Sequence, residues 1–389
     1  MQKVKKWSET LLAILSYPSI QKKINRITSN SIFVFPRFQT GGAEYVHLEI
    51  VKALKELNPV TIFSDLSSDK DLLKEFQKYS TVIYLRRWGW KTSFRKKMAK
   101  KLAKRIDLLS KPTIFGSNSE IFYDILPHLT NEYTAIDLLH TDLSNLPLSI
   151  ENYARPTTHL LSTRVLLGEG HRRKIESFYL KNNIPKSELE KIKVIPNAVN
   201  IPEQPISKDF SKNFNVLFVG RNSYEKRPEL FIEIAKRAEQ QNLPFHFLMI
   251  GEFENFVDIA PNNLKIVGKL TDRQILNQYY ENAHFIFLTS LFEGFPLVIL
   301  EALAHGVIPV STNVGEISLD INQSNLTGFI VENHGSEEQI VTSFLNYMKF
   351  FNTERHLLPH YSINGYNLVN KKFNKQQFIA SYRTLLLPK

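Results

Sequence analysis

Cysteine is absent from all 389 residues of the sequence. Disulfide frameworks and thiolate metal sites are therefore excluded, and a reducing compartment is the simpler expectation. Long apolar runs are also missing, because no stretch approaches the roughly 18 to 20 apolar residues that cross a bilayer as a helix. Near the N-terminus, Lys3, Lys5 and Lys6 precede the apolar residues LLAIL, but Glu9 interrupts the pattern and no small-residue cleavage site follows. This pattern does not predict a signal peptide.

Acidic residues are scarce in the first half of the chain. Residues 1–200 hold 32 Lys and Arg against 19 Asp and Glu, whereas residues 201–389 hold 17 against 19. The net charge of +11 therefore lies in the first half. A basic half can attract nucleic acid, an anionic membrane or phosphorylated substrates, and composition alone does not choose among them.

No internal repeat or low-complexity tract interrupts an alternation of short β-rich runs with helical patterns, which favours parallel sheets. The expected strands of a first domain are residues 32–35, 60–63, 81–85, 113–116, 136–140 and 159–163. Those of a second domain are residues 215–220, 245–251, 264–268, 284–290 and 307–312. A linker rich in Pro, Asn and Ser, residues 194–213, separates the two sets. We therefore expect an N-terminal extension at 1–30, domains at 31–200 and 201–365, and a C-terminal helix at 366–389 that returns to the first domain.

The stretch FEGFPLVILEALAHG (292–306) joins a loop to an apolar helix. Pro296 suits the first helical position, and Gly306 suits the C-terminal cap. The free N–H groups at such a helix start can hold a phosphate. Glu293 lies before that anion site, and Glu301 lies about 7.5 Å further along the axis, so the two carboxylates could bind the hexose and the ribose of a nucleotide sugar. The alternative is that Glu301 is a solvated helix residue and Glu293 an ordinary loop charge.

A second motif, VGRNSYEKRPE (219–229), places two cations on a loop between a strand and a helix that Pro228 opens. Arg221 and Lys226 could neutralise a leaving diphosphate without a metal. An ordinary solvated turn is the alternative, since Lys and Arg are common in loops.

Two further features follow strands of the first domain. Gly41 and Gly42, in FPRFQTGGAE (35–44), let the backbone approach a ligand at a helix start. His140 ends the expected strand 136–140, at the edge of the sheet where α/β proteins place ligands. A helix-capping turn and a structural histidine are the respective alternatives.

Together these motifs resemble those of retaining nucleotide-sugar glycosyltransferases of the GT-B fold, specifically family 4 (glycosyl transferases group 1). FEGFPLVILEALAHG matches the family's E-x7-E signature, and GGAE, the strand-end histidine, VIPN and VGR with a following lysine occur in the family's order. The resemblance spans roughly residues 31–386. It implies an α/β GT-B fold, with two Rossmann-like domains whose parallel sheets face a central cleft. The first domain would bind the acceptor and the second the nucleotide-sugar donor.

The resemblance also implies roles for individual donor-site residues. Glu293 and the backbone of Gly294, Phe295 and Pro296 would hold hydroxyl groups of the donor sugar, and Glu301 would hold the ribose diol.

The leaving diphosphate would be stabilised by Arg221 and Lys226, with the backbone N–H groups of Leu297 and Val298 assisting. The co-substrate would be a UDP- or GDP-sugar, and no metal or other cofactor would be required.

In the first domain, the resemblance implies that Gly41 and Gly42 line the diphosphate and that His140 contacts the sugar or supports the acceptor. It further implies front-face displacement with retention, the leaving phosphate helping to deprotonate the acceptor. Glu316 and Ile317 stand where the family commonly has Gly and Pro, which leaves the identity of the donor open.

Residues 86–111 contain eleven cations and one acid, and the apolar residues that recur at helical spacing are Trp90, Phe94, Met98, Leu102, Ile106 and Leu109. Such a basic amphipathic helix can lie on an anionic membrane, or it can pack its apolar stripe on the first sheet while its lysines meet water. Residues 1–15 could form a second interfacial helix. The expected location is the cytoplasm, with peripheral attachment to the inner face of the cytoplasmic membrane as an additional hypothesis. A glycan or lipid-linked acceptor, as in cell-surface polysaccharide synthesis, would suit a basic first domain.

Three other functions are compatible with parts of the sequence. A GT-B epimerase or phosphorylase would share the fold, but no acid/base constellation for an epimerase is evident. A nucleic-acid-binding module lacks a zinc site, an RNP-like strand and a helix-turn-helix, so no nucleic-acid partner is expected. Asp69-Lys70-Asp71 is formally the D-x-D of a metal-dependent GT-A enzyme, but it fits better as the capped start of a helix.

Overall fold

The computed structural model describes residues 15–39, 41–67 and 69–387. The chain folds into two compact units. Unit 1 comprises the residues up to Ile195 together with those from Ile379 onward, and unit 2 is Pro196–Phe378. The chain thus passes from unit 1 to unit 2 inside the segment 194–213, five residues before the expected boundary.

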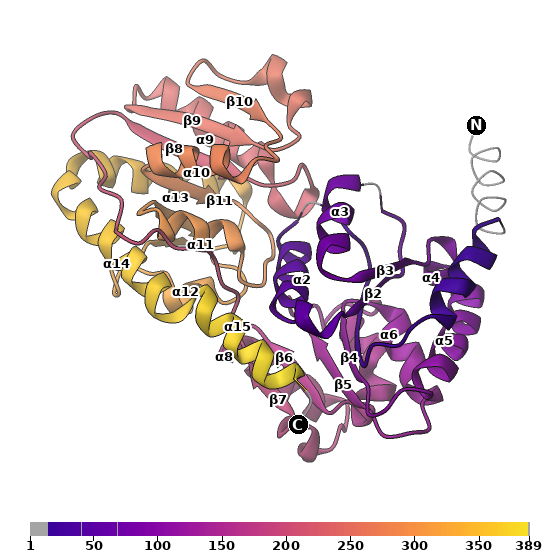
Figure 1. Ribbon diagram of the computed structural model, residues 1–389. Helices are drawn as coiled ribbons and strands as arrows, with labels where there is room; N and C mark the ends of the chain where they lie inside the picture. Colours follow the sequence, from indigo (N-terminus) through magenta and orange to yellow (C-terminus); the bar gives the residue numbers. More distant parts are fainter. Residues whose placement is uncertain (1–14, 40, 68, 388–389) are drawn as a thin grey trace. The chain divides into compact units, whose positions relative to one another are not determined.

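Within its described residues, unit 1 is built on a parallel sheet of seven strands in the order β3-β2-β1-β4-β5-β6-β7 (Figure 1). The strands are β1 (Ser31–Phe35), β2 (Val60–Phe63), β3 (Thr81–Tyr84), β4 (Thr113–Ser117), β5 (Thr134–Leu138), β6 (Thr163–Leu166) and β7 (Ile192–Val194). The α-helices are α2 (Gly42–Ala53), α3 (Lys70–Tyr79), α4 (Arg87–Trp90), α5 (Thr92–Ile106), α6 (Glu120–Ile125), α7 (Ile150–Ala154), α8 (Glu169–Lys181) and, for most of its length, α15 (Lys375–Leu386). Short 3₁₀ turns are η1 (Lys55–Leu57), η2 (Leu126–His128), η3 (Arg155–Leu160) and η4 (Lys186–Leu189).

Alternation along β1 builds both faces of this sheet. Ile32 and Val34 pack into the apolar cluster shared with α5 and α6, whereas Phe33 and Phe35 point to the opposite face. This is the period of two that a strand buried on both sides imposes on its side chains. On the second face, Phe35 stacks on His47 of α2, which brings a polar ring into the core.

Unit 2 is built on a parallel sheet that has six strands among the described residues, in the order β10-β9-β8-β11-β12-β13. The strands are β8 (Phe214–Val219), β9 (Phe245–Ile250), β10 (Leu264–Gly268), β11 (Phe285–Leu288), β12 (Ile308–Thr312) and β13 (Phe329–Val331). The helices are α9 (Pro228–Gln240), α10 (Arg273–Asn282), α11 (Leu297–Ala304), α12 (Ile317–Asp320), α13 (Glu337–Thr353) and α14 (Leu358–Lys372), and the 3₁₀ turns are η5 (Tyr224–Lys226), η6 (Glu254–Ile259) and η7 (Arg355–Leu357).

The far end of α11 is fixed against α14. A Cβ on Gly365 of α14 would come within 2.5 Å of Leu303, so the two helices approach at a distance that a larger residue would prevent. Ser362 donates a hydrogen bond to the Gly306 carbonyl (2.7 Å), and Gly306 has φ +70°, as a left-handed C-terminal cap requires. These contacts hold in place the helix that carries Glu301.

The strand predictions agree with the structure except at a few places. Residues 159–163 were expected as a strand, but η3 occupies Arg155–Leu160 and β6 begins only at Thr163. Thr157 and Thr158 donate their hydroxyls to the Ala154 carbonyl, and this continues α7 into a 3₁₀ turn. β7 and β13, three residues each, were not predicted. The expected C-terminal helix at 366–389 is divided between α14 and α15.

The basic segment 86–111 forms α4 and α5, and its apolar stripe is buried. Met98, Leu102 and Ile106 are at most 2% exposed and pack in the core with Ile20 and Ile24. The packing alternative is therefore confirmed. The exposed side of α5 carries four lysines, here called the lysine face: Lys96, Lys97, Lys100 and Lys104.

The expected N-terminal extension is described only from residue 15, so the interfacial helix predicted for residues 1–15 lies almost entirely outside the described residues. Residues 15–25 are helical, and Ile20 and Ile24 belong to the unit 1 core. Within the described part of the chain, no helix is both long enough and apolar enough to cross a bilayer.

Candidate active site

Two loops at the carboxyl edge of the unit 2 sheet are bonded to each other. One follows β8 and contains Lys226, and the other follows β11 and leads to α11. The Leu291 N–H donates to the Glu225 carbonyl (2.7 Å), and the Thr289 hydroxyl donates to the Lys226 carbonyl (2.8 Å). Ligand sites of open α/β sheets lie at this edge.

Arg227 holds these loops together. Its guanidinium donates to the carbonyls of Thr289 (2.6 Å) and Ser290 (3.0 Å) and to Asn333 Oδ1 (2.5 Å). Its side chain is buried, and its backbone lies in the left-handed region at φ +48°. Strain of this kind persists only where surrounding contacts fix the residue. Arg227 therefore positions Lys226, the residue just before it.

Lys226 and Glu293 form an ion pair across the two loops. Their side chains are 15% and 14% exposed, and the Ser290 hydroxyl donates a second hydrogen bond to Glu293 Oε1 (2.7 Å). A lysine ammonium has three donors and a carboxylate has about four acceptor positions. Each partner thus keeps capacity to bind a ligand, so the structure brings together the predicted diphosphate cation and the predicted sugar carboxylate.

The start of α11 lies directly after Glu293. Pro296 was expected as the first helical residue, but it is the N-cap in extended conformation (φ −71°, ψ 128°), and the helix begins one residue later at Leu297. The first N–H groups of a helix, here those of Leu297 and Val298, have no partner within it. The buried Asn197 of the VIPN motif donates to the Phe295 carbonyl (3.1 Å), which fixes the chain just before the helix.

A neighbouring turn packs on the same loop. Gly315 has φ +59°, and a Cβ there would come within 2.0 Å of the Gly294 carbonyl oxygen. A glycine is therefore needed for this turn to lie on the loop that carries Glu293 and Gly294.

Glu301 is 7% exposed, so the solvated-helix alternative is wrong. Its Oε1 pairs with Arg273, and its Oε2 accepts a hydrogen bond from the Tyr280 hydroxyl (3.0 Å). Burial, and then the charge of Glu301, raise the pKa of Tyr280, which keeps that hydroxyl a donor. Arg273 is half-exposed, so its contact with Glu301 can yield to a ligand more easily than that of Tyr280.

Arg221, the other predicted cation, is placed differently. Its side chain is 59% exposed and contacts Glu225 at 3.4 Å. An exposed pair of this kind contributes little to stability, so Arg221 is able to turn toward an anionic ligand.

In unit 1, Gly41 is the N-cap of α2, and Gly42 is its first residue. A Cβ on Gly41 would come within 2.5 Å of Glu44 Oε2, so the carboxylate of the first helical turn lies against this glycine. The close approach of this backbone to a ligand stays a prediction.

His140 lies two residues beyond the end of β5 and is buried. Its Nε2 is 2.9 Å from Nε2 of His47. Burial lowers the pKa of His140 to about 4, and burial followed by the charge of His140 lowers the pKa of His47 well below its usual value. Both rings are therefore neutral near pH 7.

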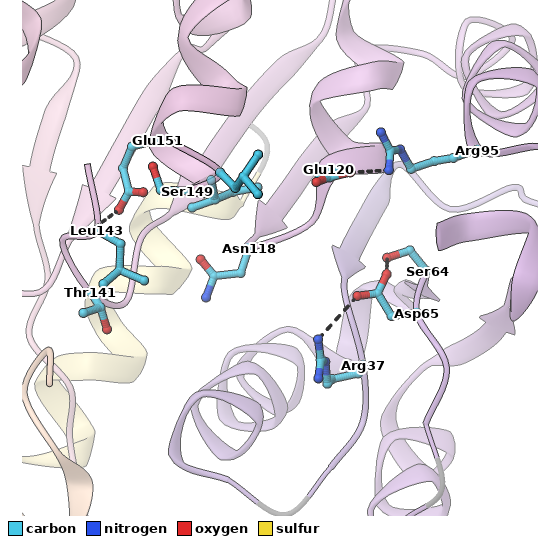
Figure 2. A pocket seen from close by; sticks show the side chains of 12 residues that line it. Arg37, Ser64, Asp65, Arg95, Asn118, Glu120, Thr141, Leu143, Ser149 and Glu151 are labelled. Atoms are coloured by element: carbon cyan, nitrogen blue, oxygen red, sulfur yellow. Dashed lines mark hydrogen bonds and ion pairs between the residues drawn. The ribbon is translucent and has the colours of Figure 1, made fainter. Parts of the chain in front are cut away.

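Unit 1 also contains a cavity of about 550 Å³ at the carboxyl ends of its strands (Figure 2). Arg37 follows β1, Asp65 follows β2, Asn118 follows β4 and Thr141 follows β5, beside His140. Asn118 has φ +48°, and its amide points into the open space. Burial raises the pKa of Asp65, whose Oδ1 accepts a hydrogen bond from its neighbour Ser64 (2.8 Å). The guanidinium, carboxylate and amide groups that line this cavity can form hydrogen bonds with a hydroxyl-rich ligand.

The far wall of this cavity includes Arg95, the buried cation of α5. Arg95 pairs with Glu120 and with Asp124 (2.7 Å), and it donates to the Tyr153 hydroxyl (2.9 Å). One cation of the basic segment thus serves unit 1 internally and does not belong to the lysine face.

Several site residues were not predicted from the sequence. They are the partners of predicted residues, namely His47, Arg227, Arg273, Tyr280 and Ser290. Three of these residues carried a signal in the sequence. Arg273 and Tyr280 are seven residues apart on one face of α10, and His47 lies within the buried stripe of α2. The other contacts depend on loop geometry.

The D-x-D sequence has a structural role. Asp69 is the N-cap of α3 and accepts from the N–H groups of Asp71 (3.1 Å) and Leu72 (3.0 Å), which confirms the capping interpretation. Among the residues that the structure describes, no group of three or more His, Asp or Glu side chains is arranged to hold a metal ion.

Comparison with known proteins identifies unit 2. Residues 200–355 match the family model "Glycosyl transferases group 1". The chain has the GT-B fold, and its second unit contains a region that matches group 1 glycosyl transferases. The chain is 22% identical over 323 residues to a Campylobacter jejuni α-1,4-N-acetyl-D-galactosaminyltransferase that acts on an undecaprenol-linked glycan. This alignment covers 79% of this chain and 85% of that protein. The Staphylococcus aureus protein CapJ is 24% identical over 219 residues, and the chain spans about half of CapJ (54%).

Solved structures show the same fold across both units. The lipopolysaccharide outer core galactosyltransferase WaaB superposes with a TM-score of 0.66 and 17% identity, covering 91% of this chain and 98% of that one. Anabaena HepE in complex with UDP-glucose gives a TM-score of 0.69 and 14% identity, covering 92% and 99%. The expected α/β fold of two parallel-sheet domains is thus confirmed.

Proposed function

We propose that the enzyme transfers a hexosyl group from a nucleotide-diphosphate sugar to a glycan or lipid-linked acceptor, in the synthesis of a cell-surface polysaccharide. One observation carries the proposal: Lys226 and Glu293 are paired directly before the free N–H groups of α11. A diphosphate needs cations and N–H donors, and a hexose needs a carboxylate that accepts from its hydroxyls. A nucleotide-diphosphate sugar would use the cation and N–H donors through its diphosphate and the carboxylate through its sugar.

In this proposal the donor spans the start of α11. The diphosphate accepts hydrogen bonds from the N–H groups of Leu297 and Val298 and from the remaining protons of Lys226, while Arg221 turns in from the surface. Glu293 accepts from hydroxyls of the sugar. Glu301, about 7.5 Å into the helix, accepts from the ribose diol and keeps its hydrogen bond from Tyr280.

The proposed chemistry is front-face displacement with retention. The bond from the anomeric carbon to the diphosphate oxygen breaks, and the acceptor oxygen bonds to the same face of that carbon. The acceptor proton passes to the leaving phosphate oxygen, whose growing charge Lys226 and the helix N–H groups stabilise. These charges do the work of a metal, so the reaction is proposed to be metal-independent. UDP is the first nucleotide to test, because the similar HepE binds UDP and UDP-glucose, and GDP is the second.

Unit 1 is proposed to hold the acceptor in the cavity lined by Arg37, Asp65 and Asn118. The names of similar proteins support an acceptor of this class. The Campylobacter enzyme and an Escherichia coli α-1,3-galactosyltransferase, 27% identical over 210 residues, act on undecaprenol-linked glycans, and Staphylococcus aureus CapH is a capsular polysaccharide glycosyltransferase. His140, with Gly41 and Gly42, is proposed to contact the donor from unit 1.

Attachment to an anionic membrane is proposed to use the lysine face alone. The apolar stripe of α5 is buried in unit 1, so this helix has no apolar face to insert. Attraction of exposed lysines to anionic lipids is electrostatic and weakens with salt. A lipid-linked acceptor would then be met at the membrane surface.

The proposal is tested by a transfer assay with UDP- and GDP-hexoses, an undecaprenyl-diphosphate-linked oligosaccharide and excess EDTA. We expect nucleotide release and a new glycosidic bond with the donor's anomeric configuration, read by NMR of the product. Asn118→Gly, which suits φ +48° and removes the amide, should raise KM for the acceptor and leave donor hydrolysis unchanged. A product of inverted configuration, or activity that EDTA abolishes, would overturn the mechanism.

A further inference from the structure

The buried pair His47 and His140 has a geometry that the proposed chemistry leaves unused. The two Nε2 atoms are 2.9 Å apart, which is a hydrogen-bond distance, so one nitrogen carries the proton and the other accepts it. His47 is 1% exposed and is held in a parallel stack on Phe35, with ring centroids 4.1 Å apart and planes 4° apart. Its ring therefore has little freedom to turn away.

The second nitrogen of His47 decides which ring donates. His47 Nδ1 is fully buried and has no hydrogen-bond partner among the described residues. If His140 were the donor, neutral His47 would carry its proton on Nδ1, which would bury an N–H without an acceptor. If His47 is the donor, Nδ1 has only an unshared lone pair. Orphaned buried N–H groups are rarer than under-satisfied acceptors in proteins.

We infer that His47 is a positioning residue that donates its Nε2–H to His140 and thereby fixes the His140 proton on Nδ1. The Nδ1 atom of His140 makes no hydrogen bond to a described residue and is not among the fully enclosed polar atoms. His140 then presents a neutral N–H donor to an oxygen of the ligand, for example a sugar hydroxyl or a phosphate oxygen.

This assignment excludes a role as general base for His140. In the fixed tautomer its only lone pair, on Nε2, accepts from His47, and the exposed nitrogen is already protonated. The lowered pKa values of both rings agree, because neither takes up a second proton near pH 7. The inference rests on the proposed function for the identity of the oxygen that His140 meets, but the tautomer itself does not.

The direct test is ¹⁵N NMR of the full-length protein labelled at histidine, in which protonated and bare imidazole nitrogens have well-separated shifts. His47→Gln and His140→Gln assign the two rings. We expect the proton on Nδ1 of His140 and on Nε2 of His47 in the wild type. A His140 with its proton on Nε2 would overturn the inference whatever the activity shows.

Activity then tests the consequence. His47→Phe keeps the stack on Phe35 and removes the donor, and His47→Gln restores an N–H donor. We expect His47→Phe to release His140 into the other tautomer and to lower kcat/KM on the order of 10-fold, the lower end of the loss seen when the orienting partner of a metal-ligating histidine is removed. His47→Gln should recover most of that loss, and the affinity for free nucleotide should not change. Equal losses in the two variants, with the tautomer unchanged, would mean that His47 only fills space.

Failure of the proposed function gives a different result. If the wild-type enzyme and His140→Gln transfer sugar equally well, His140 has no role in transfer, although the NMR result can still establish the tautomer. If the tautomer is wrong but His140→Gln is inactive, the role of His140 stands and the inference about His47 falls.

Discussion

Replacing Lys226 by Met removes a charge at the centre of the proposed donor site and keeps most of the side-chain volume. Two effects follow, and they have different sizes. Glu293 loses its ionic partner and keeps only the Ser290 hydroxyl. The leaving diphosphate loses its cation.

The stability effect lies between two known limits. Exposed ion pairs contribute about 0 to 1 kcal/mol, and breaking a fully buried pair costs about 3 to 5 kcal/mol. At 15% and 14% exposure this pair is closer to the buried limit, but the spare hydroxyl contact compensates part of the loss. We therefore expect Lys226→Met to lower the free energy of unfolding by about 2 kcal/mol, or roughly 4 to 8 °C in Tm for a domain of this size.

The effect on catalysis should be larger. Losing one preorganised charge-stabilising group at an anionic transition state costs about 100- to 1,000-fold in kcat. The double variant Lys226→Met/Glu293→Gln separates the two effects, because removing both partners of a pair is close to neutral for stability. Its Tm should return to within about 2 °C of the wild type, while kcat stays low.

Calorimetry and a nucleotide-release assay measure the two effects on the same samples. A Lys226→Met enzyme with nearly full kcat and a lowered Tm would show that Lys226 is purely structural. A double variant that regains activity would show that the unpaired Glu293, and not the missing cation, had stopped the reaction.

Three further predictions concern the supporting structure. Arg227→Lys loses the forked contacts to the Thr289 and Ser290 carbonyls, each of which is worth about 1.5 to 3 kcal/mol with a charged donor; urea unfolding should show a loss of about 2 to 4 kcal/mol, and a change below about 0.5 kcal/mol would contradict the positioning role. The folded pKa of His140, about 4, lies below its unfolded value of 6.5, so between these pH values the unfolded state binds a proton that the folded state does not, and stability falls as the pH falls. From pH 6.5 to 4, the wild type should lose on the order of 3 kcal/mol more than His140→Gln, and parallel stability curves would refute this. Changing the four lysines of the lysine face to Gln should weaken binding to anionic vesicles by about 1 kcal/mol per charge at low salt, without altering Tm, whereas unchanged binding would exclude this face as the attachment site.

Elements with strong local signals were predictable from the sequence. The FIFL and VTIF runs have high β-propensity, so these strands lie close to their expected positions. Pro228 has a fixed φ that suits a helix start, and Gly306 adopts the left-handed conformation that ends a helix, so these helix ends were also predicted. Short edge strands such as β7 and β13, with three residues each, have too few alternating positions to stand out from a loop. The strand predicted at residues 159–163 was wrong because side-chain hydroxyls extend α7 into a 3₁₀ turn, and the apolar pattern of the sequence does not reveal such a turn.

The candidate site was predictable only in part. Motif spacing indicated Lys226 and Glu293, which follow predicted strands, and Glu301, which lies within the helix that begins after Glu293. Their partners come from other segments: Tyr280 reaches Glu301 from α10, and Arg227 acts through backbone carbonyls that carry no sequence signal. Such contacts depend on tertiary packing.

The central claim is that α11 and the loops before it bind a nucleotide sugar without a metal. Isothermal titration of UDP-, GDP-, ADP- and dTDP-sugars in EDTA, with Glu301→Gln and the exposed Glu281→Gln as a matched control, tests it most directly. The account predicts saturable binding of one nucleotide family, weakened at least about 10-fold by Glu301→Gln, as loss of a charge-assisted hydrogen bond requires, and unaffected by Glu281→Gln. Binding of no nucleotide sugar, or equal affinity in both variants, would contradict it.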